Sequence, residues 1–297
     1  MSSLKEIRTR IASVKSTRKI TSAMKMVAAA KLKKAQDAVL NLRPYANKLY
    51  GILVDISKSL EGEEIYTEYL QKPKTENGKV LLITITSNKG LCGGFNSSVI
   101  KKGVELAKGK YKKQARNGDL YFYTIGRKGS EFFRSKGYNI YGSNDEILEN
   151  ASFKDATPLI QSIMDSFVNQ EFDRIELIYN KFKNAAVYIL TEDQFLPVNM
   201  EFEDSEEENN HYDYIYEPGK VEIVENLIPQ ILRIQFYDAI LESLAAEHGA
   251  RMTAMHKATD NATDLIKELQ LTYNKARQAA ITSEISEVVS GAEALRK

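Results

Sequence analysis

Residues 87–94 (SNKGLCGG) form a glycine-rich stretch directly after an apolar run, and they are the first candidates for chemistry in this sequence. Such turns can hold a phosphate at a helix N-terminus. The glycine spacing, however, fits neither G-x-G-x-x-G nor the P-loop. Residues 103–110 are a second near match, but Tyr111 stands where the P-loop needs Ser or Thr. We therefore interpret 87–94 as a tight strand-to-helix connection and expect no bound cofactor.

The remaining reactive side chains do not form a recognisable catalytic or metal site. Cys92 has no His near it in sequence, so we interpret it as a small packed thiol rather than a nucleophile. His248 and His256 are eight residues apart with Glu247 adjacent, which does not match H-E-x-x-H. Acidic pairs within 201–208 are interpreted as solvated charge. The sequence thus predicts no catalytic residue and no metal ligand.

The overall composition excludes several classes of protein. The chain has 297 residues, 43% hydrophobic and 27% charged, so it can bury a core. A net charge of +1 excludes a globally basic nucleic-acid-binding protein. The single Cys excludes an intrachain disulfide. No run of about 18 apolar residues is present, so we expect no membrane-spanning helix.

The near-zero net charge results from two segments of opposite sign. Residues 1–34 carry ten Lys and Arg against one acid, Glu6. Residues 201–213 carry seven acids and no Lys or Arg, and we expect them to form a surface loop or a disordered segment. The basic start is not a signal peptide, because no apolar segment follows it.

The middle of the chain alternates between strand-like and helix-like segments, which predicts a small α/β domain over about 70–195. Residues 79–86 (KVLLITIT) are typical of a buried strand. Further strands are expected at 119–125, 175–179 and 185–190, and helices near 96–110, 127–136 and 157–171.

The N-terminal segment has the heptad pattern of a coiled coil. Ser3 and Glu6 form a capping box, and Pro44 is expected to kink the helix without ending it. The two core positions of each heptad are apolar throughout the segment, except at Arg18, Thr21 and Lys25. The full seam is Leu4, Ile7, Ile11, Val14, Arg18, Thr21, Lys25, Ala28, Leu32, Ala35, Val39, Leu42, Ala46, Leu49, Leu53, Ile56 and Leu60.

The C-terminal segment repeats this pattern after residues 217–219 (EPG), with Pro229 in the first turn or at a kink. Its seam is Ile234, Tyr237, Leu241, Leu244, His248, Arg251, Met255, Ala258, Ala262, Leu265, Leu269, Thr272, Ala276 and Ala279. Two such helices can pair with each other in antiparallel orientation. The second is longer, so its apolar end should protrude by roughly 16 Å and need a partner.

The three polar positions of the first seam have two interpretations. Either another requirement overrides packing at Arg18, Thr21 and Lys25, or the seam drifts there to Ile20, Met24 and Val27. The sequence does not choose between them.

Several strings, in the expected order along nearly the whole chain, resemble the gamma subunit family of F-type ATP synthases. The acidic stretch 201–211 matches no motif of that family. The matching strings are residues 7–14, 19–29, 90–94, 214–218, 251–255, 258–261, 269–278 and 281–292.

The resemblance implies a fold class: a long antiparallel two-helix coiled coil formed by the N- and C-terminal helices, plus a central Rossmann-like α/β domain. The expected parts are 1–60, 70–195, an acidic linker 196–219, and 220–297. The family is a non-catalytic, rotating central shaft that couples transmembrane proton flow to ATP synthesis or hydrolysis at the beta subunits. The implied partners are three alpha and three beta subunits, epsilon, and the c-subunit ring.

The resemblance also implies which residues meet these partners. The end of the second helix, 281–295, would turn in an apolar sleeve of the alpha/beta ring. Tyr214, Tyr216 and Glu217 are implied near the c ring or epsilon. Because the chain begins almost at the family's N-terminus, without a transit peptide, we expect the cytoplasmic face of a bacterial inner membrane. The implied alpha/beta contacts are Met24, Lys25, Arg251, Arg277, Gln278, Thr282, Glu284, Ile285 and Val288.

Two other functions are alternatives to the rotating shaft. The first is a coiled-coil scaffold whose basic helix binds anionic lipid, but Lys and Arg are scattered around that helix, which suits insertion into a protein ring better than a flat membrane. The second is an α/β enzyme that uses the glycine-rich turn, which nucleotide binding to the isolated chain would support.

Overall fold

The computed structural model describes residues 4–59, 68–70, 78–198 and 219–294. Two long helices dominate it: α1 (Leu4–Ser59) and α6 (Lys220–Ala294). Pro44 lies inside α1 and does not end it. Pro229 is the tenth residue of α6, so of the two expectations for it, a place in the first turn was wrong. Tyr214, Tyr216, Glu217 and the acidic stretch fall outside the described residues, so the expected division into four parts stays a prediction.

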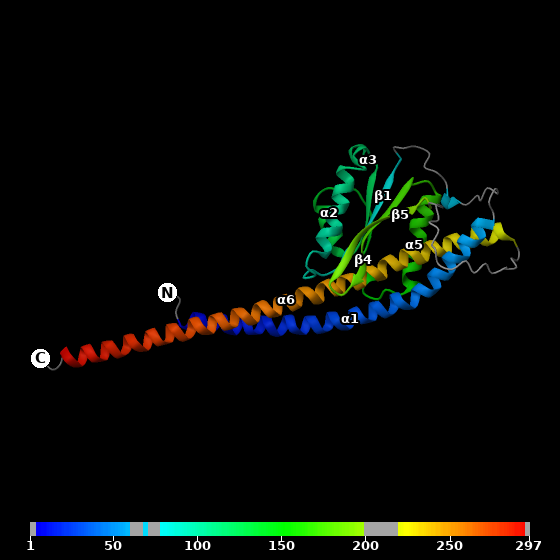
Figure 1. The fold of residues 1–297 in the computed structure, drawn as a ribbon. Coiled ribbons are helices and arrows are strands. Elements are labelled where there is room, and N and C mark those ends of the chain that lie inside the picture. The colour runs from blue at the N-terminus through cyan, green and yellow to red at the C-terminus, as the bar shows by residue number, and fades with distance from the viewer. Residues whose placement is uncertain (1–3, 60–67, 71–77, 199–218, 295–297) are drawn as a thin grey trace. The chain divides into compact units, whose positions relative to one another are not determined.

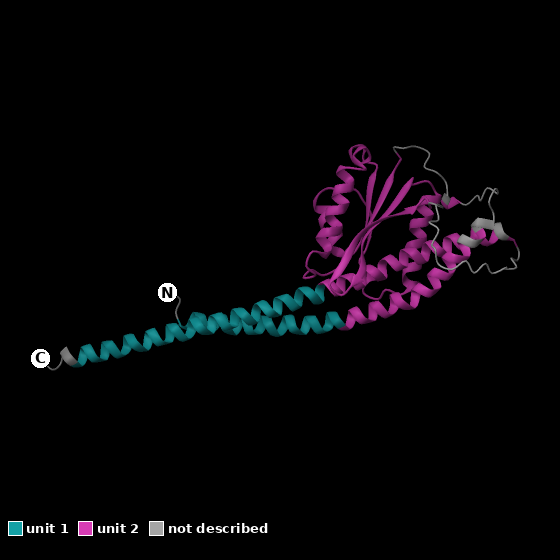
Figure 2. Ribbon diagram, viewed as in Figure 1, with its two compact units in different colours: residues 1–29, 251–297 teal, residues 30–250 magenta. Residues whose placement is uncertain are grey.

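The chain separates into two compact units (Figure 2). The first, here called the coiled unit, comprises residues 1–29 and 251–297. The second, here called the sheet unit, comprises residues 30–250. Both α1 and α6 contribute residues to each unit, and each unit is described by itself below.

The sheet unit contains a five-stranded sheet in the order β3-β2-β1-β4-β5 (Figure 1). The first four of these strands are parallel, while β5 runs antiparallel to β4. The strands are β1 (Val80–Ile85), β2 (Leu120–Ile125), β3 (Ile140–Asn144), β4 (Arg174–Asn184) and β5 (Val187–Leu196). The connecting helices are α2 (Phe95–Lys108), α3 (Lys112–Asn117), α4 (Arg127–Ser135) and α5 (Phe153–Val168). Two single-turn 3₁₀ helices are η1 (Glu68–Leu70) and η2 (Glu146–Leu148).

The central strand β1 explains why the sheet has two covered faces. All six of its side chains are buried, and the five apolar ones are divided between two separate apolar clusters according to the face they point to. Leu82 joins the cluster that contains Val99 of α2 and Phe133 of α4. Leu81 and Ile83 join the larger cluster beneath α5. The parallel sheet is thus a middle layer between two layers of helices.

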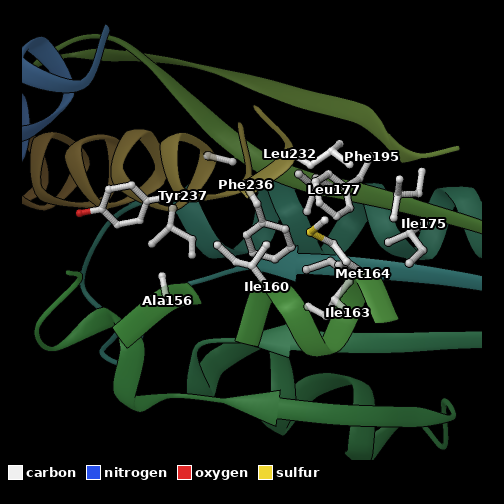
Figure 3. Packing of buried hydrophobic residues seen from close by; sticks show 14 of the residues in the cluster. Ala156, Ile160, Ile163, Met164, Ile175, Leu177, Phe195, Leu232, Phe236 and Tyr237 are labelled. Atoms are coloured by element: carbon white, nitrogen blue, oxygen red, sulfur yellow. The ribbon is translucent and has the colours of Figure 1, made fainter. Parts of the chain in front are cut away.

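The larger cluster joins the sheet to both long helices (Figure 3). Ile160 and Met164 of α5 contact the same cluster as Leu177 of β4 and Phe236 of α6. Phe236 packs edge-to-face on Phe195 of β5, with ring centroids 5.3 Å apart. The expected fold class is confirmed: two long terminal helices and a central α/β domain.

Apart from the two 3₁₀ helices, one strand and one helix were not predicted from the sequence. Residues 140–144 (IYGSN) form β3 although they contain no apolar run, because an edge strand that is only half-buried needs few apolar residues. Residues 112–117 (KKQARN) form the short helix α3, in which only Gln114 is buried.

Candidate functional site

The paired helices of the coiled unit are the first candidate surface for function (Figure 1). Thr21 of α1 and Thr259 of α6 approach to 2.8 Å between their hydroxyl oxygens. Further toward the N-terminus, Arg8 and Ile11 line a hollow with Gln270 and Asn274. Residue numbers fall along one helix as they rise along the other, so the helices pair in antiparallel orientation, as expected.

Burial shows which of the two seam interpretations holds in the coiled unit. Thr21 is buried, and Arg18 and Lys25 are half-buried, so the seam continues through its polar positions. The alternative seam was wrong at two of its three positions, because Ile20 and Val27 are each 57% exposed. On α6, Met255, Ala262 and Ile266 are buried, whereas the predicted seam positions Thr272 and Ala279 are exposed.

An exposed apolar face therefore runs along α1 on the side away from the pairing seam. Ile20 and Val27 lie on it, each with 57% of its surface in solvent. Met26 is 63% exposed but lies about 100° further round the helix than Val27. The sequence interpretation considered Ile20 and Val27 only as pairing residues. Their seven-residue spacing, outside a seam already filled, is the signal that could have identified a second face.

The end of α6 is exposed on all sides. Every described side chain from residue 281 to residue 292 is exposed, a length of about 18 Å at 1.5 Å per residue. Ile285 and Val288 are 58% and 71% exposed, and Ile281 and Val289 are about half exposed. An apolar helix face of this length in water is typical of a protein-protein contact.

The predicted contact residues fall into two groups. Met24, Lys25 and Arg251 are half-buried within the helix pair. The others, all on the exposed last part of α6, are Arg277, Gln278, Thr282, Glu284, Ile285 and Val288. Thr282 donates a hydrogen bond to the carbonyl of Gln278 one turn earlier, so its hydroxyl serves the helix backbone.

The glycine-rich turn is closed by its own side chains. The Asn96 Oδ1 accepts a hydrogen bond from the backbone N–H of Ser87, and the Asn96 amide donates to the Ser87 hydroxyl. Cys92 is buried against Phe95 and Ala246. Leu91 adopts φ +64° and is 65% exposed. The turn therefore connects β1 to α2, as the sequence predicted, and its Cys92 packs against Ala246 of α6.

The backbone N–H groups at the N-terminus of α4 also have their hydrogen-bond acceptors within the protein. The first three N–H groups donate to Asn88 Oδ1, to the Ser87 carbonyl and to Thr86 Oγ1. These are the groups that would otherwise be available to a phosphate.

A network of charged groups fastens α2 and α3 to the β4-β5 hairpin. Lys110 Nζ lies 2.6 Å from Glu176 Oε1 and 2.9 Å from Glu192 Oε1. The Tyr111 hydroxyl donates a short hydrogen bond to Glu176, which is buried. Burial, together with this carboxylate, raises the pKa of Tyr111 to about 12. Lys110 is paired with both carboxylates, which indicates that this network has a structural role.

Asp238 and Glu242 form a second acidic group, one turn apart on α6, that the sequence interpretation missed. Glu242 is buried; its Oε1 lies 3.2 Å from Arg43 of α1, and its Oε2 accepts the N–H of Phe182. Burial, and then the charge of Glu242, raise the pKa of Asp238 to about 6, although Arg43 and Lys181 act in the opposite direction. The spacing of Asp238 and Glu242 in the sequence matches no motif from which their proximity to Arg43 and Phe182 could be predicted.

Within the described ranges, no cluster of three or more His, Cys, Asp and Glu could hold a metal ion. His256 lies instead 3.4 Å from Asp260 on the same helix. Over these ranges, no helix is both long enough and apolar enough to cross a membrane.

Comparison with known proteins matches this chain over almost its whole length. The family model described as ATP synthase matches residues 3–295. An ATP synthase gamma chain from Flavobacterium johnsoniae is 52% identical over 295 residues, which cover 99% of each chain. The ATP synthase gamma chain of Christiangramia forsetii is 49% identical, again with 99% of each chain covered.

Solved structures give the same result for the fold. A chain in the cryo-EM structure of the Tetrahymena thermophila mitochondrial ATP synthase central stalk and c-ring is 26% identical, with a TM-score of 0.57. The match covers 80% of this chain and 99% of that one. A chain in the Euglena gracilis mitochondrial ATP synthase has a TM-score of 0.64 at 18% identity, covering 98% and 94%, which shows the shared fold.

Proposed function

The chain belongs to the family of ATP synthase gamma chains, and from this premise we propose that it assembles with three alpha and three beta subunits, with epsilon and with the c-subunit ring. It is the non-catalytic central-stalk subunit of its complex, a rotor that couples transmembrane proton flow to ATP synthesis or hydrolysis at the beta subunits. The bacterial relatives and the c-ring of the Tetrahymena complex support a peripheral position on the cytoplasmic face of the inner membrane.

The mechanism follows from asymmetry. Three identical catalytic sites differ from one another only when something without threefold symmetry touches them. A single shaft supplies this difference, because its faces carry different side chains. On α1, the exposed apolar residues Ile20 and Val27 lie on one side and the pairing seam on the other. A turn of one third of a revolution exchanges the three sites, so rotation becomes a change in nucleotide affinity.

The observation that carries the proposed contact with the ring is the exposed apolar end of α6. Here an apolar sleeve of the alpha/beta ring would cover Ile281, Ile285, Val288 and Val289, which are all half-exposed or more. Such a sleeve removes apolar surface from water without fixing the rotation of the helix, because apolar contacts are not directional.

Further contacts with the ring are proposed within the helix pair of the coiled unit and along the last part of α6. The basic charge of residues 1–34 favours acidic loops of beta as the partners. The proposed residues are Met24, Lys25, Arg251, Arg277, Gln278, Thr282 and Glu284, in addition to Ile285 and Val288. We also propose that Tyr214, Tyr216 and Glu217 contact the c ring or epsilon.

Reconstitution with alpha and beta tests the proposed contact of the tip. A chain without residues 278–297 should give a complex that dissociates at lower temperature and hydrolyses ATP several-fold more slowly. The same stability and rate as the full chain would overturn the tip contact.

A pair of point variants tests the same contact without shortening the chain. Ile285→Asp with Val288→Asp places two carboxylates on the apolar face, where burial would cost several kcal/mol. The matched control is Ser286→Asp with Ser290→Asp, which adds the same charge to exposed positions on the opposite side of the helix. The first pair should weaken the complex, while the control stays within about twofold of the parent.

A further inference from the structure

A group of exposed basic side chains lies on the sheet unit where α2 ends and α3 begins (Figure 1). Residues 108–116 (KGKYKKQAR) carry five Lys and Arg and no acid. Lys110 is neutralised by Glu176 and Glu192. The exposed cations that have no ion-pair partner among the described residues, here called the basic surface, are Lys108, Lys112, Lys113, Arg116 and Lys136.

The basic surface lies at the edge of the sheet where the parallel strands begin. The carbonyl of Asp119, two residues after α3, accepts the N–H of Val80 at the start of β1. The Asn139 amide, three residues after Lys136, donates to the carbonyl of Gly118. The ends of α2 and α4 and the whole of α3 are therefore neighbours. Asp119, the nearest acid in sequence to α3, is only half exposed.

The packing of α3 aims its three cations in one direction. At 100° per residue, Lys112, Lys113 and Arg116 lie within an arc of about 100°, and the buried Gln114 lies on the opposite side. The hydroxyl of Tyr111, the residue before α3, donates to the buried Glu176 of β4 and so fixes the start of this helix on the sheet. The cations are thus held together on a rigid support.

Helix stability does not account for all of these charges. Lys108 and Arg116 stand in the last turns of α2 and α3, where a cation is favourable. Lys112 and Lys113 stand in the first turn of α3, where a cation is unfavourable, and no acid accompanies them there. Two lysines at such positions indicate that a requirement other than folding selects them.

We propose that the basic surface binds the phosphate groups of an anionic lipid bilayer. A cluster of four or more Lys and Arg is typical of electrostatic adsorption to such lipids. Between residues 92 and 140 no large apolar side chain is exposed, so this surface lacks both a wedge for insertion and the apolar anchor of a protein interface. Tyr111 is buried, so it offers no ring for stacking on nucleic-acid bases.

The choice of a lipid surface rests on the proposed peripheral position of this chain at the inner membrane. The two proposals can nevertheless fail separately. Reconstitution with alpha and beta tests the contacts of the shaft without lipid, whereas lipid binding is measured on the full chain without other subunits.

Cosedimentation of the full chain with unilamellar vesicles tests the proposal. Vesicles of phosphatidylglycerol and phosphatidylcholine, mixed one to two, should bind the chain at least tenfold more tightly than vesicles of phosphatidylcholine alone. Binding should weaken at least fivefold between about 50 mM and about 300 mM NaCl, because salt shortens the screening length. Absence of binding, equal binding to both vesicles, or binding independent of salt would overturn the proposal.

Variants of equal charge locate the lipid contact. Replacing Lys112, Lys113 and Arg116 together by Gln should weaken binding to the anionic vesicles at least fivefold. The matched control replaces Lys31, Lys33 and Lys34, three exposed cations of α1, by Gln and should change binding less than twofold. An equal loss in both variants would show that total charge or α1 is responsible, and would contradict the assignment.

Two further measurements define the chemistry of the contact. Lys112→Arg with Lys113→Arg keeps both charges and should bind the anionic vesicles within about twofold of the parent, as an electrostatic contact requires. A large loss in this variant would overturn the electrostatic account. Inorganic phosphate at constant ionic strength should not release the chain from the vesicles. Release by phosphate would indicate a site for a single free anion and would contradict binding to a lipid surface.

Discussion

Thr21 and Thr259 are 238 residues apart in sequence, yet their hydroxyl oxygens lie 2.8 Å apart in the seam of the helix pair. Each hydroxyl also contacts a carbonyl of its own helix: Thr21 that of Arg18, and Thr259 that of Met255. The two hydroxyl protons are thus shared among three hydrogen-bond contacts: one between the hydroxyls and one to each carbonyl. A polar pair at a packing position defines the register of the two helices, because sliding either helix would separate the hydroxyls.

This pair should show energetic coupling. Thr21→Val and Thr259→Val should each lower the free energy of unfolding by about 1 kcal/mol, the net value of one hydrogen bond. The double variant should cost clearly less than the sum, because it leaves no hydroxyl without its partner. Urea unfolding followed by circular dichroism measures the cycle, and strictly additive costs would show that the contact contributes nothing.

The Arg43–Glu242 pair predicts unequal effects of its two members. Glu242→Ala should lower the free energy of unfolding by about 2–3 kcal/mol, because it leaves the Phe182 N–H without its buried acceptor as well as breaking the ion pair. Arg43→Ala should cost less, since Arg43 is half in solvent. Lys267→Ala, from an exposed pair, is the control and should cost well under 1 kcal/mol. An equal cost for Arg43 and Glu242 would contradict this account.

Two glycines of α6 should respond in opposite directions to alanine. A Cβ on Gly249 would lie 2.9 Å from the Ala185 carbonyl oxygen, a backbone atom at the tip of the β4-β5 hairpin. Gly249→Ala should therefore lower the free energy of unfolding by about 1–3 kcal/mol. A Cβ on Gly291 would have no neighbouring atom within 4 Å. Gly291→Ala should therefore leave the free energy of unfolding unchanged or raise it by up to about 1 kcal/mol. Thermal unfolding of both variants tests the prediction, which a stabilised Gly249→Ala chain would refute.

The raised pKa of Asp238 predicts a specific pH dependence. Folding favours the protonated carboxyl, so the stability this group contributes is complete below its unfolded pKa, near 4, and is lost as the pH rises through about 6. Asp238→Asn should therefore stabilise the chain at pH 8 relative to the parent and show little difference at pH 4. Melting temperatures of both chains across this range provide the test, and a difference that does not grow with pH would rule the effect out.

The seam of the long helices could be predicted from sequence because its cause is local. Side chains at heptad spacing share one face whatever else the chain does. Ile7, Ala28, Leu32 and Val39 are all buried as this spacing requires. The protruding apolar end of α6 followed from the same periodicity, through the different lengths of the two helices.

Other features depend on contacts that no local pattern records. Drift of the seam to Ile20 and Val27 was as plausible from spacing as its continuation through Thr21, and the choice depends on what the partner helix presents there. The burial of Glu242 and Asp238 depends on β4 and α1, which meet them only in the folded sheet unit. The strand β3 was missed because pairing with β2, rather than its own composition, makes it a strand.

Rotation of this chain within its complex is tested most directly by a single-molecule measurement. Cys92 is buried, so Lys113→Cys on the exposed face of α3 provides a selective attachment point for a bead. In a complex with immobilised alpha and beta subunits, ATP should turn the bead in one direction, in steps of a third of a revolution. ATP hydrolysis at the full rate with a stationary bead would contradict the account.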